Sequence, residues 1–148
     1  MFKKTIRGVV LSLVACLPLG AGASDHGETV DNVMIILSSG SAQTQGMAMV
    51  LGNAMAEDGA NVDVLLCDAA GDLALAEGDG GPELAPKGFT PVKLLRGLMA
   101  KGASVSVCAL YLPNSRYSES DLAEGVAVAK PPQMVALMRD PEVRVFTF

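Results

Sequence analysis

The feature that most constrains the fold is the regular alternation of short apolar runs with segments of helical pattern. The run 33–37 is continuously apolar, as in strands that are covered on both faces. A turn of small residues at 38–41 and a segment with helical spacing follow it, and this succession opens a βαβ unit. The alternation continues to the C-terminus, so we expect a three-layer α/β sandwich with a mainly parallel sheet of about five strands flanked by helices.

The residue pattern also places the elements and their inner faces. We expect strands at 33–37, 62–67, 103–108, 126–128 and 143–148, the last at a sheet edge. Thr90-Pro91 caps one helix, and Ser118 to Asp121 has the form of a capping box. Trp is absent and aromatic residues make up 4% of the chain, so Val, Leu, Ala and Met must fill the core. The helical positions expected to face inward are Met47, Val50, Leu51, Ala54, Met55, Leu94, Leu95, Leu98, Met99, Met134, Val135, Leu137 and Met138.

The first residues predict a secretory signal peptide over 1–23. A short basic head precedes an apolar run at 8–19, and Ala21-Gly22-Ala23 is a small-residue cleavage pattern. The apolar run is shorter than the roughly 20 residues of a membrane-spanning helix, so we expect no integral membrane span. Residues 24–31 are then a flexible leader and 32–148 a single domain of a periplasmic or secreted protein. An alternative is a lipoprotein, because 13–16 resembles a lipobox that ends at Cys16.

Charge excludes several classes of partner. Removal of Lys3, Lys4 and Arg7 from the 11 basic residues leaves 8 against 16 acidic ones, so the mature domain is strongly acidic. Such a surface repels phosphate backbones, and we expect neither nucleic acid nor an anionic membrane as a partner. His26 is the single histidine and has no second ligand nearby, so no metal site and no cofactor are expected.

Two cysteines of the expected domain lie where strands end. Cys67 and Cys108 should therefore reach the same edge of the sheet, where α/β proteins collect ligands and reactive groups. In a strand order 2-1-3, one strand would separate them and their Cα atoms would stand about 9–10 Å apart. A disulfide needs less than about 7 Å, so the thiols would share a cleft unbonded. Two alternatives stay open: Cys108 is a small buried core residue, or oxidising conditions pair the two cysteines.

A reactive thiol needs nearby groups that favour the thiolate. The available cations are Arg116, on the loop after Cys108, and Lys87, on a Gly- and Pro-rich segment at 77–89 that could cover the site. With Tyr111 and Asn114 they form the set of candidate binding residues. Because His26 lies in the leader, no base is available for Cys-His or Ser-His-Asp hydrolysis. Thiol chemistry that needs little acid–base help remains, and sulfur transfer is such a chemistry.

The strand that ends in Cys108 is followed by the pattern Glu119-x-Asp121-Leu122-x-x-Gly125-Val126. A helix then leads to a C-terminal Val-x-Val-Phe strand at 143–146. This arrangement resembles the DsrE/DsrF-like family, over most of residues 31–148. The resemblance implies a flavodoxin-like α/β fold, homo-oligomers, and a strand-end cysteine that carries persulfide, which maps onto Cys108. Tyr111 stands where one common type of member has a second cysteine.

Two functions follow as hypotheses. In the first, an exported DsrE-like protein carries or relays sulfur on Cys108, with Cys67 as a possible second thiol and a sulfur donor or acceptor protein as partner. In the second, the chain is a non-catalytic, homo-oligomeric module that binds a small ligand or a partner, and the cysteine is structural. If the chain is active, it is a sulfurtransferase-like carrier.

Overall fold

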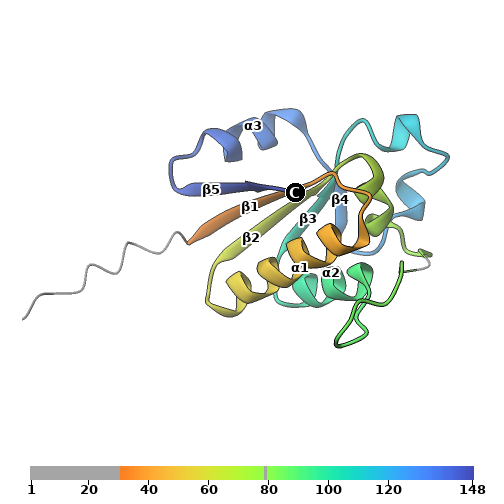
Figure 1. The fold of residues 1–148 in the computed structure, drawn as a ribbon. Coiled ribbons are helices and arrows are strands. Elements are labelled where there is room, and N and C mark those ends of the chain that lie inside the picture. The colour runs from red at the N-terminus through yellow and green to blue at the C-terminus, as the bar shows by residue number, and fades with distance from the viewer. Residues whose placement is uncertain (1–30, 79) are drawn as a thin grey trace, which may run out of the picture.

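The computed structural model describes residues 31–78 and 80–148, and the expected signal peptide lies outside them. Five parallel strands form one sheet in the order β4-β3-β2-β1-β5 (Figure 1). They are β1 Asn32–Leu37, β2 Asn61–Leu66, β3 Ser104–Val107, β4 Val126–Val128 and β5 Val143–Thr147. The helices are α1 Ala42–Glu57, α2 Pro91–Ala100 and α3 Pro131–Arg139, with short 3-10 helices η1 Asp68–Ala74, η2 Leu112–Asn114 and η3 Glu119–Asp121. The predicted α/β sandwich is confirmed.

The strand order differs from the expected 2-1-3, because β2 lies between β1 and β3. The chain moves in one direction across the sheet from β1 to β4, and right-handed crossovers then place α1 and α2 on the same face. After β4 the chain returns to pair β5 with the free edge of β1, which places α3 on the opposite face. Figure 1 shows α1 and α2 together on one side of the sheet and α3 on the other.

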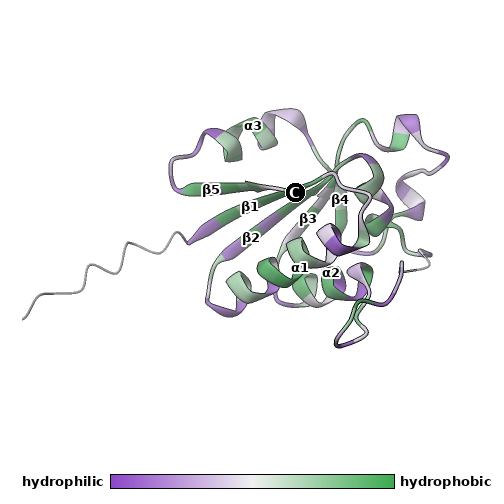
Figure 2. Cartoon of the chain, viewed as in Figure 1, coloured by the Kyte–Doolittle hydropathy of each residue, from purple (hydrophilic) through white to green (hydrophobic). Residues whose placement is uncertain are grey.

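The main core lies between the sheet and the layer of α1, α2 and η1. Alternate residues of the central strands point into it, and hydrophobic colour follows these strands in Figure 2. Its fully buried side chains include Ile35, Leu37, Met49, Leu66, Leu95, Leu98 and Val107. At the amino ends of β1 and β2 the sequence turns polar, and the Asn61 side-chain amide donates to Asn32 Oδ1 at 3.1 Å. The main core thus fixes the central strands that carry the two cysteines.

The prediction of which side of α1 packs against the core is wrong. Met47, Val50 and Leu51 are 55%, 47% and 40% exposed, and the buried residues are instead Gln45, Gly46, Ala48, Met49 and Gly52. The reason is close packing: a Cβ on Gly52 would lie 2.9 Å from Leu98 Cδ2 and 3.0 Å from Ile35 Cδ1. Only a stripe of small residues allows this approach, so the larger apolar side chains turn outward.

The opposite face of the sheet has a thinner cover. Its buried residues are Met34, Leu65 and Ala129, and α3 adds only Met134 and Leu137, both partly buried. The expected inward positions Val135 and Met138 are 51% and 45% exposed, because this short helix contacts the sheet along one narrow stripe. The sheet is therefore covered less deeply on this face.

Several local predictions are confirmed. The Thr90 hydroxyl accepts the Lys93 N–H at 3.2 Å, with Pro91 in the first turn of α2. Ser118 and Asp121 form the expected capping box at η3, and β5 is an edge strand. No helix in the described part of the chain combines the length and apolar character needed to cross a membrane.

Candidate functional site

Cys67 and Cys108 directly follow two neighbouring strands. Leu66 and Val107 are partners in the parallel register of β2 and β3, so the residues after them continue side by side. The Cys108 N–H donates to Leu66 O at 2.7 Å, and the Cys67 N–H donates to Leu37 O at 2.8 Å. Neighbouring strands lie about 4.8 Å apart. The expected separation of about 9–10 Å between the Cα atoms of Cys67 and Cys108 is therefore wrong, because it assumed the strand order 2-1-3.

Both thiols point to the α3 face of the sheet. Leu66 and Val107 belong to the main core, and side chains alternate along a strand, so the next residue on each chain faces the other way. Cys67 and Cys108 pack with Met34, Leu65 and Ala129 in the smaller cluster beside α3. Both cysteines are half-buried and unbonded. Each cysteine thus packs partly against apolar side chains and keeps part of its surface exposed.

The surroundings of Cys67 disfavour its thiolate. Burial raises the pKa of the Cys67 thiol to about 11, and the charge of Cys108, a hydrogen bond to Cys108 and the charge of Asp68 raise it further in that order. Cys67 therefore holds its proton at neutral pH and can donate it in a hydrogen bond to the Cys108 sulfur. Cys108 is left as the candidate nucleophile of the pair.

Cys108 also lies at the carboxyl edge of the sheet, directly after the strand next to the edge strand β4. The chain leaving β3 runs toward η1, where Ala123 N–H donates to Ala74 O at 2.8 Å, and the chain leaving β4 enters α3 on the other face. Open α/β sheets bind ligands outside the carboxyl ends of their strands. The topology therefore favours Cys108 as a site of chemistry.

The structure does not bring the predicted cations to the thiols. Arg116 is exposed and lies 5.0 Å over the Tyr117 ring, with Nη2 donating to the Tyr117 hydroxyl at 2.9 Å. Lys87 lies in an apolar groove of about 700 Å³ between α1 and the Gly- and Pro-rich segment. That segment is anchored against α1 and not over Cys108, since the Leu84 side chain occupies the notch left by Gly46.

Tyr111 and Asn114 hold the loop after Cys108 in place. The Tyr111 hydroxyl donates to Asp72 Oδ1 at 2.5 Å, and its ring lies over Gly71. Burial, followed by the hydrogen bond to Asp72, raises the pKa of the Tyr111 hydroxyl well above its usual value. The Asn114 side-chain amide donates to Leu110 O at 2.8 Å. These contacts tie the Cys108 loop to η1, the segment that follows Cys67.

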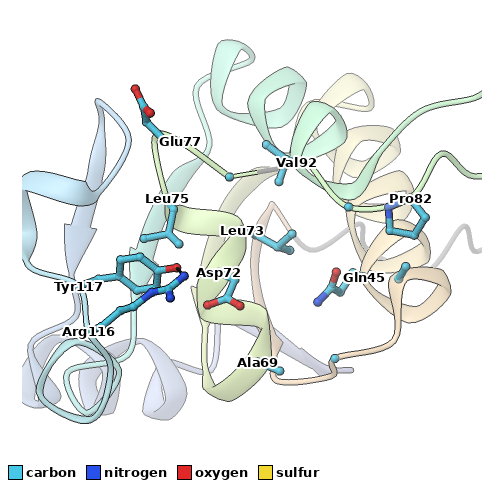
Figure 3. A pocket seen from close by; sticks show the side chains of 15 residues that line it. Gln45, Ala69, Asp72, Leu73, Leu75, Glu77, Pro82, Val92, Arg116 and Tyr117 are labelled. Atoms are coloured by element: carbon cyan, nitrogen blue, oxygen red, sulfur yellow. Dashed lines mark hydrogen bonds between the residues drawn. The ribbon is translucent and has the colours of Figure 1, made fainter.

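Sequence reasoning missed a polar cavity of about 550 Å³ on the α1 side of the sheet edge. Figure 3 shows Asp72 between Arg116 and Tyr117 on one side and Gln45 on the other. Gln45 is only 8% exposed, and its amide donates to Ser39 O at 2.9 Å. A Gln inside a helical segment is an ordinary surface residue by pattern, so only the packing of α1 reveals it. Neither cysteine lines this cavity.

Residues 31–78 and 80–148 contain no group of three or more His, Cys, Asp or Glu side chains that could hold a metal ion.

These features define a class: an α/β sandwich with an all-parallel sheet in its described part and two thiols side by side at the carboxyl edge. No protein-family model and no curated protein sequence matches the chain. Among solved structures, the chain is similar to the ychN protein from E. coli, with a TM-score of 0.65 and 16% sequence identity. The match covers 80% of this chain and 99% of that one. The likeness shows a shared fold and supports the DsrE-like fold expected from the sequence.

Proposed function

We propose that this protein is a sulfur carrier that holds sulfane sulfur as a persulfide on Cys108. The observation that carries the proposal is the pairing of Cys108, at the carboxyl edge of the sheet, with a second thiol that follows the neighbouring strand and keeps its proton. Persulfidation is a reversible modification of accessible thiols. The DsrE-like fold agrees with this role, which the sequence resemblance also implies.

Loading is a simple displacement. The Cys108 thiolate attacks a sulfane sulfur of a polysulfide or of a donor protein's persulfide, and its electron pair forms the new S–S bond. The S–S bond of the donor breaks, and its electron pair leaves on the shortened polysulfide or on the donor thiolate. The Cys108 thiol loses its proton to solvent, so no protein side chain has to act as a base. The Cys67 S–H lies beside the product and can donate a hydrogen bond to it.

The cellular setting is part of the proposal. The signal peptide over 1–23 exports the chain to the periplasm or beyond, where a sulfur donor or acceptor protein meets Cys108. The chain acts as a homo-oligomer in this setting. Arg116 and Lys87 then serve at most to attract such a partner, since their contacts lie with Tyr117 and in the α1 groove.

The test is sulfur loading mapped to a residue. The purified full chain and its Cys67→Ser and Cys108→Ser variants are exposed to inorganic polysulfide under argon, desalted and digested for mass spectrometry. We expect the Cys108 peptide of the Cys67→Ser chain to gain about 32 Da, and a thiol reductant to remove the gain.

The Cys108→Ser chain is the matched control, because it keeps Cys67 and the same fold. Its corresponding peptide should gain nothing, and its Cys67 peptide should gain little. A Cys108 peptide that gains no sulfur in the Cys67→Ser chain would contradict the proposal.

The polar cavity favours a second candidate function, a binding module for a small polar ligand. Its walls offer a carboxylate, a guanidinium and a buried amide from Asp72, Arg116 and Gln45 (Figure 3). In this case Cys108 is a packed side chain. It would then resist alkylation in the folded chain and react only after denaturation, while carriage requires reaction in the folded state.

A further inference from the structure

Cys67 stands where it can react with a persulfide on Cys108. The two residues follow in-register positions of adjacent strands, and their side chains pack in the same cluster beside α3. The strand spacing of about 4.8 Å falls within the Cα separation of roughly 4.4–6.8 Å that disulfides adopt. Sulfur loaded on Cys108 extends outward from its Sγ, which leaves that Sγ within reach of the Cys67 sulfur.

The backbone around the pair is fixed, so this contact is built into the fold. Each cysteine N–H donates to a carbonyl of the neighbouring strand, to Leu37 O for Cys67 and to Leu66 O for Cys108. Tyr111 N–H donates to Cys108 O at 2.9 Å, and Ala70 N–H donates to Cys67 O at 3.0 Å. Both strand ends are therefore anchored on each side of the thiols.

We propose that Cys67 discharges the Cys108 persulfide as sulfide and closes a Cys67–Cys108 disulfide. The Cys67 thiolate attacks Cys108 Sγ, a bond forms between the two Sγ atoms, and the bond from Cys108 Sγ to the sulfane sulfur breaks. The Cys67 proton passes to the outer sulfur of the persulfide anion, and this sulfane sulfur leaves with the electron pair as hydrosulfide. Two thiols are oxidised to one disulfide and one sulfane sulfur is reduced to sulfide, so electrons balance. This inference rests on the proposed function and gives it an outcome, sulfide release, that a simple carrier lacks.

The surroundings of Cys67 make the discharge slow compared with loading. Cys67 belongs to an apolar cluster with Met34 of β1 and Met134 of α3, and the charged groups that act on it are Asp68 and, when ionised, Cys108. None of these is a cation that would favour a Cys67 thiolate. The persulfide therefore persists long enough to meet an acceptor, and Cys67 releases sulfide when none arrives. An external dithiol reductant then resets the pair.

The experiment follows one turnover after loading. The full chain is loaded with inorganic polysulfide under argon and desalted, and free sulfide and intact mass are then followed over time. We expect the wild-type chain to lose the added sulfur, release one sulfide per loaded chain and end about 2 Da below the dithiol mass. Cys67→Ser and Cys67→Ala chains should keep the persulfide at least about tenfold longer and form no such disulfide.

Ser106→Ala is the matched control, because Ser106 lies on the same face of the same sheet, two residues before Cys108, and carries no sulfur. Its discharge rate should equal that of the wild type. Persulfide that lasts as long in the wild type as in both Cys67 variants, or that decays without the disulfide, overturns the inference and leaves the carrier function standing. Absence of loading in all chains overturns the proposed function and the inference with it.

Discussion

Cys67 and Cys108 differ in what surrounds them, although each follows a strand of the same sheet. The pattern of apolar runs ending in cysteine was enough to predict that both reach the carboxyl edge, and this prediction is confirmed. Their contact could not be predicted, because the strand order depends on how distant segments pair. Asp68, which turns the chain after Cys67 with φ of 48°, also acts on Cys67 only through this three-dimensional arrangement.

The raised pKa of Cys67 predicts slow alkylation of this thiol in the folded chain. With a pKa of about 11, its rate should rise about tenfold per pH unit through pH 9 and level off only near 11. Iodoacetamide labelling between pH 7 and 11, read by peptide mass, measures this. The same chain in urea is the control and should level off near the ordinary value of 9.0. A plateau near that value in the folded chain would contradict the assignment.

The raised pKa of Cys67 also makes the stability of the fold depend on pH. The folded pKa of Cys67 lies above its unfolded value, so the unfolded chain ionises first as pH rises. This thiol's contribution to stability is complete below pH 9 and is lost as the pH rises toward 11.

Gly71 and Tyr111 form a second pair that the sequence did not reveal. A Cβ on Gly71 would lie 2.3 Å from Tyr111 Cδ2, so Gly71→Ala must displace the ring and its hydrogen bond to Asp72. We expect the free energy of unfolding to fall by about 1–3 kcal/mol in a urea titration. In a Tyr111→Ala background the same change should cost much less. An equal cost in both backgrounds would show that the ring is not the cause.

At the scale of elements, the helix positions were predictable, but the inner face of α1 was not. The periodicity of large apolar residues located α1, yet Gly46 and Gly52 determine which side packs, because they allow neighbours to approach closely. Sequence periodicity weighs large apolar residues most and gives little weight to glycine. The helix α2, which has no such notch toward the core, buries Leu95 and Leu98 as its pattern predicts.

Two helical glycines should therefore respond in opposite ways to alanine. A Cβ on Gly46 would lie 2.2 Å from Leu84 Cδ1, whereas a Cβ on Gly97 in α2 meets only Asn53 Oδ1 at 3.6 Å. We expect Gly46→Ala to destabilise the fold by about 1 kcal/mol and to release the segment around Leu84. Gly97→Ala should stabilise it by about 0.5–1 kcal/mol.

Thermal unfolding and limited proteolysis of the two variants measure these effects. The proteolysis should show faster cleavage near Leu84 in Gly46→Ala alone. Equal stability changes in the two variants, or unchanged cleavage near Leu84, would contradict the packing of this segment against α1.

At the scale of the whole molecule, the one-directional path from β1 to β4 separates two surfaces at the same sheet edge. The polar cavity lies on the α1 side and the thiols on the α3 side. The alternation of strands and helices was sufficient to predict the layers. Once the strand order is known, right-handed crossovers explain which face of the sheet each helix covers. The order itself arises from long-range pairing, such as that of β5 with β1, which no local pattern encodes.

The chain should associate in solution. Met47, Val50 and Leu51 expose apolar surface on α1, and the resemblance found in the sequence implies homo-oligomers. Light scattering coupled to size exclusion should give a multiple of the chain mass, which is 15.2 kDa for all 148 residues. The mass of a single chain over a wide range of concentrations would contradict this expectation.

The most direct test of the central claim counts sulfane sulfur on the loaded protein. After polysulfide treatment and desalting, cyanide converts each sulfane sulfur to thiocyanate, which is measured by colour. We predict about one sulfane sulfur per Cys67→Ser chain and close to none per Cys108→Ser chain. Equal amounts in the two variants, or none in either, would contradict the claim that Cys108 carries sulfur.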